Sequence, residues 1–299
     1  MSYENTLQQL ALNDERYIVV TAENRAAIRN LPLVLGDRFI DTGITEQTMI
    51  GLAAGLALRG RVPVVHALAA FLTMRAFEFI RTDVGLGRLP VKLVGGVPGF
   101  LSDANGPTHQ ALEDVALMRG IPHVQVFCPA DEQDLVLGLP HVLASPQPVY
   151  IRHNPLPPAI EHKPDFVIGQ AECVATGSDV TILVYGMLLK QAVVARQRLE
   201  QEGISVRLLN LRMLKPIDEA AILTAARETR LLVTLEDHFI TGGLYSIVAE
   251  LLTRACLGAP VLPIALNQRW FKPALLADVL AHEGFTGPQL ARQIAARLT

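Results

Sequence analysis

The segment Arg61–Gly96, RVPVVHALAAFLTMRAFEFIRTDVGLGRLPVKLVGG, decides the fold class of this chain. Its two short apolar runs, RVPVVHA and PVKLVGG, have the β-branched composition of buried strands. The stretch between them, Phe71–Gly85, has the apolar spacing of a helix. A strand, a helix and a second apolar strand in this order predict a parallel sheet with helices covering both of its faces.

The same alternation continues on both sides of this segment. Further strands are predicted in YIVVT (Tyr17–Thr21), HVQVFCP and PVYIRH, with a helix over DEQDLVLGLPHVLAS. After the proline-rich segment His153–Lys163 the pattern restarts, with strands in DVTILVYG, ISVRLLNL, RLLVTLED and VLPIAL. The sequence therefore predicts two doubly wound α/β domains, residues 1–160 and the smaller 176–299, joined by a linker over residues 161–175.

The bulk composition excludes several classes of function. The 299 residues are 50% apolar and carry a net charge of −3 without blocks of like charge, which argues against nucleic-acid and membrane partners. The three cysteines, Cys128, Cys173 and Cys256, lack the spacing of a zinc site or a disulfide framework. The polar N-terminal stretch has no signal-peptide core, and no apolar run reaches membrane-spanning length. We expect a soluble cytoplasmic protein without a metal site of its own.

Candidate functional residues follow the predicted strands, because open parallel sheets bind ligands at the carboxyl ends of their strands. Glu46 follows RFIDTGI, His66 ends VPVVH, and Arg152 ends VYIR. The long loop GGVPGFLSDANGPTHQ follows VKLV. These positions are where the sequence predicts a ligand site.

Glu46 begins the predicted helix of DTGITEQTMIGLAAG, Asp41–Gly55. On spacing alone it is a first-turn glutamate that interacts with the helix macrodipole, worth about 0.3–1 kcal/mol. The helix behind it is apolar on all faces and therefore buried. A carboxyl group at the mouth of a buried helix also suits a ligand nitrogen with which it shares a proton.

His109, in GPTHQ, has two interpretations. Thr108 is suited to cap a helix over HQALEDVALMRG, which would make His109 a surface residue at the start of that helix. The long glycine-rich loop before it favours a substrate-binding role, because long loops in compact domains are often functional.

Phe71, Arg75 and Arg152 also have alternative roles. Phe71 lies near a strand end, where its ring is suited to face a flat ligand, whereas the later aromatic residues of the same helix are assigned to the core. Arg75 is either an anion-binding residue or a surface arginine, and Arg152 either an anion-binding residue or an ion-pair partner.

Several motifs resemble one known family. DTGITEQTMIGLAAGLALRGRVPVVHALAAFLTMRAFEFIRTDV, GPTHQALEDVALMRGIPHVQVFCPADEQD and PVYIRHN are similar to the pyrimidine-binding domain of transketolases. Deoxyxylulose-phosphate synthases share much of this pattern, and the closest likeness is to the C-terminal subunit of split bacterial transketolases. LLVTLEDHFITGGLYSIVAELL resembles the C-terminal domain of the same family. The likeness covers nearly the whole chain in collinear order.

The resemblance implies thiamine diphosphate as the cofactor. Glu46 matches the family glutamate that hydrogen-bonds the pyrimidine ring nitrogen, and Phe71 matches the aromatic residue that stacks on this ring. Leu68 stands where a further aromatic residue of the pyrimidine pocket is usual. His109 is implied to act in catalysis together with Glu46.

The same resemblance implies a set of substrate-binding residues: His66, Arg75, Asn105, His109 and Arg152. Arg75 and Arg152 match arginines that bind the substrate phosphate. Asn105 replaces the usual aspartate before GPTH, and Val97 stands near the place of a family loop histidine. Both departures imply an unusual sugar substrate.

The chain contains no GDG motif, through which the family holds magnesium and the diphosphate in another domain. The resemblance therefore implies an N-terminal partner subunit, an α2β2 assembly with a β–β contact, and transfer of a two-carbon ketol unit between sugars or sugar phosphates. One alternative is the β subunit of a 2-oxoacid dehydrogenase, although such subunits usually carry a GGxHSQ-like loop in place of GPTHQ. Another is a non-catalytic homologue.

Overall fold

A seven-stranded sheet organises the first half of the chain in the computed structural model, which describes residues 1–298. Its strand order is β10–β5–β6–β4–β3–β1–β2, and every neighbouring pair is parallel except β10–β5. The strands are β1 (Tyr17–Thr21), β2 (Phe39–Asp41), β3 (Val62–Leu68), β4 (Lys92–Gly96), β5 (Gln125–Phe127), β6 (Val149–Arg152) and β10 (Met213–Lys215).

Helices cover both faces of this sheet, as the strand alternation requires. In β1, Val19 packs into the core formed with α1 (Tyr3–Asn13), α2 (Leu31–Leu35) and α6 (Glu132–Ala144). Its neighbours Ile18 and Val20 pack into the opposite core. That core includes residues of α3 (Glu46–Leu58), of the Phe71–Gly85 segment and of α5 (Asp114–Gly120). The predicted doubly wound α/β class is confirmed.

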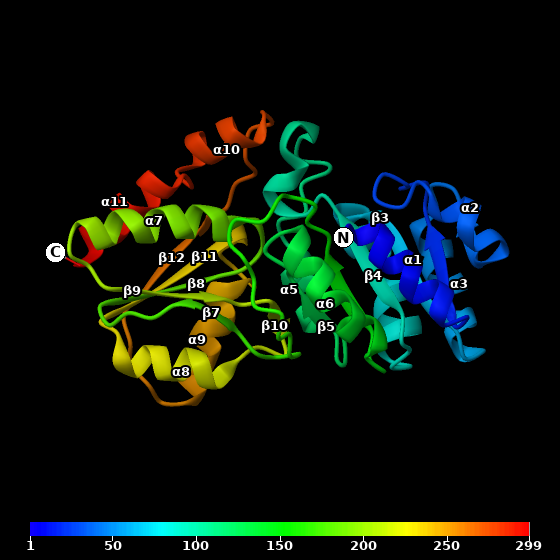
Figure 1. Ribbon diagram of the computed structural model, residues 1–299, viewed down its shortest axis with the longest axis horizontal. Coiled ribbons are helices and arrows are strands. Elements are labelled where there is room, and N and C mark those ends of the chain that lie inside the picture. Colours follow the sequence, from blue (N-terminus) through cyan, green and yellow to red (C-terminus); the bar gives the residue numbers. More distant parts are fainter. Residues whose placement is uncertain (299) are drawn as a thin grey trace.

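The second sheet has five strands in the order β12–β11–β8–β9–β7. They are β7 (Glu172–Ala175), β8 (Val180–Val184), β9 (Val206–Asn210), β11 (Leu231–Phe239) and β12 (Val261–Leu266). Figure 1 shows α7 (Leu189–Gln201) and α11 (Gly287–Leu298) on one side of this sheet, and α8 (Glu219–Glu228) and α9 (Leu244–Arg254) on the other. The remaining helix, α10 (Leu276–Glu283), lies beyond α7 in the same view.

Two short strands differ from the sequence expectation, because three or four residues are too few for a periodic pattern. β7 lies within the range 161–175 assigned to the linker and pairs antiparallel at the edge of the second sheet. β10 lies within the range assigned to the second domain, yet it pairs antiparallel with β5 of the first sheet. The chain of the second half therefore completes the first sheet.

The helices differ from expectation at three places. The polar N-terminal stretch forms α1, which Ser2 caps by accepting a hydrogen bond from the Asn5 backbone N–H. The helix predicted over HQALEDVALMRG begins only at Asp114. The segment Phe71–Gly85 is helical but contains two π-helical stretches, η2 (Phe71–Arg75) and η3 (Ile80–Gly85), around α4 (Phe77–Phe79). Within residues 1–298, no helix has both the length and the apolar character needed to cross a membrane.

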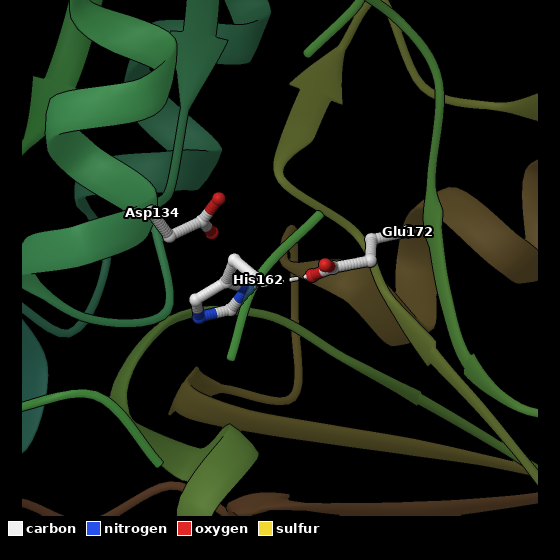
Figure 2. Close-up of side chains that lie close together, drawn as sticks. All are labelled: Asp134, His162 and Glu172. Carbon is white, nitrogen blue, oxygen red and sulfur yellow. Dashed lines mark hydrogen bonds and ion pairs between the residues drawn. The ribbon is translucent and has the colours of Figure 1, made fainter. Parts of the chain in front are cut away.

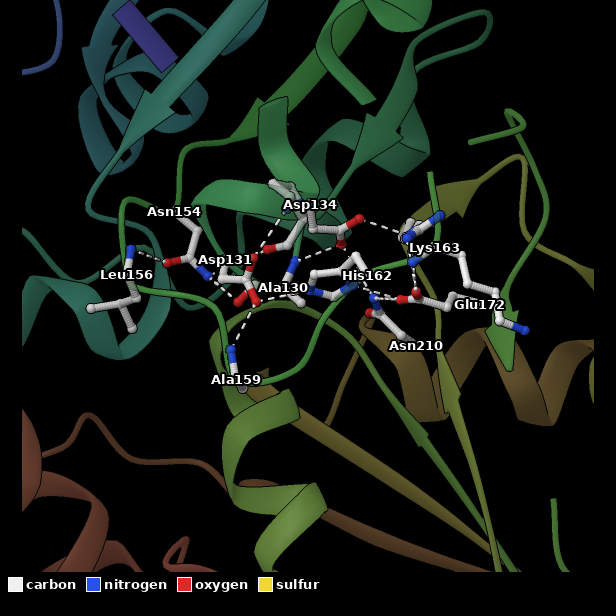
Figure 3. A network of polar contacts seen from close by, with 12 residues as sticks. Ala130, Asp131, Asp134, Asn154, Leu156, Ala159, His162, Lys163, Glu172 and Asn210 are labelled. Carbon is white, nitrogen blue, oxygen red and sulfur yellow. Dashed lines mark hydrogen bonds and ion pairs between the residues drawn. The ribbon is translucent and has the colours of Figure 1, made fainter. Parts of the chain in front are cut away.

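A buried ion cluster joins the two halves at His162, in the connecting segment (Figures 2 and 3). The His162 Nδ1 lies 2.7 Å from Oε2 of Glu172 in β7, and its Nε2 lies 2.8 Å from Oδ2 of Asp131 at the start of α6. Burial opposes charge on the ring, but these two hydrogen bonds raise the pKa of His162 to about 9. The ring is therefore an imidazolium that binds both domains.

Arg212 supplies a second positive charge to the same cluster. Its guanidinium pairs with Asp134 (Nε–Oδ1 2.7 Å) and with Glu172 (Nη2–Oε1 3.0 Å). The ligand atoms of Asp134, His162 and Glu172 lie within 4.8 Å of one another, which is a spacing suited to a metal ion. Both ring nitrogens and the carboxylates are already engaged in ion pairs, so this geometry is that of an interdomain ion cluster.

Candidate functional site

Glu46 is the first residue of α3, and its side chain is 2% exposed. Arg75 Nη1, from η2, donates a hydrogen bond of 2.7 Å to Oε2 of Glu46. The Arg75 side chain is 40% exposed, so the pair has one buried and one accessible member. The carboxylate lies at the start of the helix, as the sequence predicted, and it has a cationic neighbour. The helix itself is not buried on all sides as expected, because Thr48, Gly51, Gly55 and Leu58 are exposed.

Phe71 and His109 complete a contiguous group with this pair. The Arg75 guanidinium lies 4.2 Å from the centroid of the Phe71 ring, a cation–π contact. The Phe71 and His109 rings contact edge to face, with their centroids 5.0 Å apart. The His109 Nδ1 lies 2.9 Å from Oγ1 of Thr108. The structure thus brings together four residues that the sequence singled out on three separate segments.

Phe71 and Arg75 lie four residues apart in η2, a spacing that places both side chains on the same side of a helical segment. π-Helical turns are rare and occur frequently at functional sites. Phe71 lies one turn before Arg75, and its ring packs against the Arg75 guanidinium. A regular helix was predicted here, and the irregular turn carries no clear sequence signal.

The loop that carries Asn105 and His109 is fixed at the domain boundary. It includes η4 (Gly99–Asn105), whose Gly99 has φ +55° and lies against Asp237 of β11. A Cβ atom at this glycine would lie 1.8 Å from the Asp237 Oδ2. Gln110, next to His109, donates a hydrogen bond of 2.9 Å to the Phe271 backbone carbonyl. Asn105 itself is exposed at the end of η4.

Arg152 does not join the Glu46 group. Its side chain lies in the domain interface, where Nε lies 2.8 Å from Oδ2 of Asp114 and Nη1 lies 2.7 Å from Oδ1 of Asp237. Tyr150 also donates a hydrogen bond to Asp114, at 2.6 Å. With Arg152 only 3% exposed and two carboxylates bound to it, this geometry favours the ion-pair interpretation over the anion-binding one. Sequence reasoning missed both aspartates, since each lies far from Arg152 in the chain.

His66 and Leu68, at the end of β3, lie at a cavity with His153. The Tyr3 hydroxyl of α1 lies 2.7 Å from Nε2 of His66. Burial, with a smaller contribution from His153, lowers the pKa of His66 to about 3, and burial lowers that of His153 to about 4. Both imidazoles are therefore neutral at neutral pH. Tyr3 was not predicted to lie near this site.

Two family profiles match most of the chain. Residues 1–154 match the family described as "Transketolase, pyrimidine binding domain", and residues 169–290 match "Transketolase, C-terminal domain".

The chain is also similar to named relatives and to a solved structure. It is 37% identical to the 6-deoxy-6-sulfo-D-fructose transketolase subunit SqwH of Clostridium sp. (strain MSTE9), over 85% of this chain and 80% of that protein. It is 35% identical to the 1-deoxy-D-xylulose-5-phosphate synthase of Synechococcus sp. (strain JA-2-3B'a(2-13)), over 99% of this chain but only 46% of that protein. It thus spans about half the length of such synthases.

The solved structure is titled "Split gene transketolase, inactive beta4 tetramer". It superimposes with a TM-score of 0.89 at 32% identity, and the match covers 99% of this chain and 96% of that one.

Proposed function

The chain belongs to the transketolase family, and from this premise we propose that it is the C-terminal subunit of a split transketolase that transfers a two-carbon ketol unit between sugars or sugar phosphates. One observation carries this proposal. Glu46, Arg75, Phe71 and His109 form one contiguous group at the carboxyl ends of the strands of the first sheet. The family resemblance assigns catalytic or binding roles to the same four residues.

The residues of this group fit the pyrimidine end of thiamine diphosphate. A buried carboxylate beside an aromatic ring is suited to a flat nitrogen heterocycle, which needs a hydrogen-bond acceptor at its edge and a ring against its face. Glu46 would hold the proton at the ring nitrogen, while Phe71 and Leu68 would contact the ring. When bound, thiamine diphosphate supplies the electron sink for cleaving the bond next to a carbonyl carbon.

Substrate contacts are proposed for the side chains around this group. His109 would hydrogen-bond the carbonyl or hydroxyl groups of the reacting sugar. Asn105 and His66 would hydrogen-bond its other hydroxyl groups. Arg75 is the accessible cation of the group, with 40% of its side chain exposed. Arg152 instead becomes a positioning residue, because it connects β6 to Asp237 of β11.

The diphosphate end of the cofactor and a magnesium ion are assigned to an N-terminal partner subunit. The sequence has no GDG motif. Among residues 1–298, the one cluster with metal-like spacing is the ion cluster of His162, whose groups already pair with one another. We propose an α2β2 assembly with a β–β contact. Two exposed apolar residues are suited to such a contact: Ile44, which precedes α3, and Leu58, its last residue. A reducing cytoplasm suits the three free cysteines.

Reconstitution tests the proposed function against its alternatives. The chain would be mixed with a candidate N-terminal subunit, thiamine diphosphate and magnesium, and assayed with ketose donors and aldose acceptors. Ketol transfer supports the proposal. Oxidative decarboxylation of a 2-oxoacid would instead identify a dehydrogenase β subunit, and absence of both activities with an assembled complex would identify a non-catalytic homologue.

We predict that the isolated chain binds thiamine diphosphate at least about 100-fold more weakly than the assembled complex, because it lacks the groups that neutralise the diphosphate. Isothermal titration calorimetry of the chain alone and of the complex measures the difference. Equal affinity in the two titrations would contradict the shared site. The Glu46→Gln variant serves as the control for binding at the pyrimidine end.

A further inference from the structure

A cavity of about 310 Å³ lies beside the proposed site, at the carboxyl ends of β1, β3, β4 and β6. Asn24 of the β1 loop, His66 and Leu68 of β3, Val97 after β4 and His153 after β6 contribute to its wall. Parallel sheets bind their ligands at this edge, and the volume is at the lower end of the usual range for ligand pockets. Leu68 in this wall and Phe71 at the start of η2 are only three residues apart in the chain.

Among the described residues 1–298, no lysine or arginine lines this cavity. Its ionisable groups are His66 and His153, and burial keeps both rings neutral by lowering their pKa values to about 3 and about 4. The nearest arginine in sequence, Arg152, lies beside His153 but binds Asp114 and Asp237 in the domain interface. The residues that this chain contributes to the cavity therefore have no charge to offset the desolvation of a phosphate or sulfonate group.

The wall is largely apolar, with Leu68, Val94, Val97, Leu101 and Pro155 as its aliphatic members. Val97 has φ +46°, a left-handed conformation that is unusual for a β-branched residue. Such conformations persist where the surrounding structure imposes them, and they concentrate at ligand sites. Here the loop conformation places an aliphatic residue in the wall.

A few neutral polar groups interrupt this apolar wall. Asn24 contributes a side-chain amide to the wall, and an amide can both donate and accept hydrogen bonds. The imidazole of His66 is fixed from behind by the Tyr3 hydroxyl at 2.7 Å. The aliphatic side chains of such a wall can pack against the carbon–hydrogen groups of a ligand. Its neutral amide and imidazoles can hydrogen-bond the ligand's hydroxyl groups.

We propose that this cavity receives the uncharged end of the substrate, a hydroxylated or deoxygenated carbon tail that carries no phosphate or sulfonate. The inference rests on the proposed ketol transfer and specifies its substrate class. It makes Val97 a specificity-determining residue, because its side chain stands where a cation would be needed to bind an anionic tail.

A matched pair of acceptors tests this specificity in the reconstituted complex: D-glyceraldehyde and D-glyceraldehyde 3-phosphate. The wild type should use the uncharged aldehyde with a kcat/KM at least about tenfold higher than that of the phosphate ester. Val97→Arg should shift the ratio toward the phosphate ester by about tenfold or more, because it adds a guanidinium to the wall. Val167→Arg adds the same charge at a distant exposed position and should leave the ratio unchanged. A wild-type preference for the phosphate ester would overturn the inference.

A binding measurement separates this inference from the proposed function. Histidine labelled with ¹³C at Cε1 reports on the full chain by NMR, and His66→Gln and His153→Gln assign the two signals. D-Glyceraldehyde should shift both signals, and the phosphate ester should shift them far less. Such shifts without ketol transfer would contradict the proposed function and support the cavity assignment. Ketol transfer without the shifts would contradict the cavity assignment alone.

Discussion

Glu46→Gln is expected to lower kcat of the reconstituted complex by about 10²–10⁴-fold, the range typical of losing a positioned proton-transfer group. The amide keeps the size of the side chain but cannot hold a proton at the cofactor ring nitrogen. The partner of Glu46, Arg75, is 40% exposed, so water can solvate the guanidinium once the carboxylate is gone. Steady-state kinetics with saturating thiamine diphosphate measures the effect.

Two controls distinguish this catalytic loss from damage to the fold. Glu202→Gln removes an exposed carboxylate at the end of α7 and should leave kcat unchanged. The thermal unfolding midpoint of Glu46→Gln should stay close to that of the wild type. If Glu46→Gln kept activity within about threefold of wild type, the interpretation as a helix-dipole glutamate would be the correct one.

The sequence could predict the parts of the fold that have a strong local pattern. β3, β4, β8 and β11 were predicted because a buried parallel strand needs a continuous apolar run. The edge strands β7 and β10 have only a few residues each and take their pairing from distant segments, so no local pattern reveals them. The pairing of β10, from the second half of the chain, with β5 of the first sheet therefore depends on tertiary packing and cannot be predicted from local sequence.

The residues of the candidate site could be predicted from the sequence, but most of their contacts could not. Glu46, Phe71 and His109 were singled out because strand ends of a parallel sheet meet at one edge, and Arg75 because the family resemblance implies an anion-binding arginine there. The contact between Arg75 and Glu46 joins two elements that are distant in the chain, so local spacing does not predict it.

Arg152 is the clearest example of a role that the sequence alone could not decide. Position alone left both an anion-binding and an ion-pair role open, and only the buried Asp114 and Asp237 favour one of them. Neither aspartate has a sequence signal that connects it with Arg152, because Asp114 meets it through the packing of α5 on the first sheet and Asp237 only where the two domains pack together.

His162→Gln is the second change with a large expected effect, and it acts on stability. Removing the imidazolium leaves Asp131 and Glu172 buried without their shared partner, and breaking a buried ion pair in this way costs about 3–5 kcal/mol. Urea denaturation near pH 6 measures the loss. His123→Gln, at an exposed position, should change the free energy of unfolding by less than about 0.5 kcal/mol.

The pH dependence of this difference identifies the imidazolium as its cause. The pKa of His162 is raised from 6.5 to about 9 in the folded chain, so its contribution is fully present below about pH 6.5 and is lost as the pH rises through 9. A shift of this size corresponds to about 3 kcal/mol, in agreement with the cost of breaking the pair. The difference between wild type and His162→Gln should therefore shrink between pH 6 and pH 9.5. A difference that stays constant over this range would mean that His162 stabilises the interface by packing and hydrogen bonding without its charge.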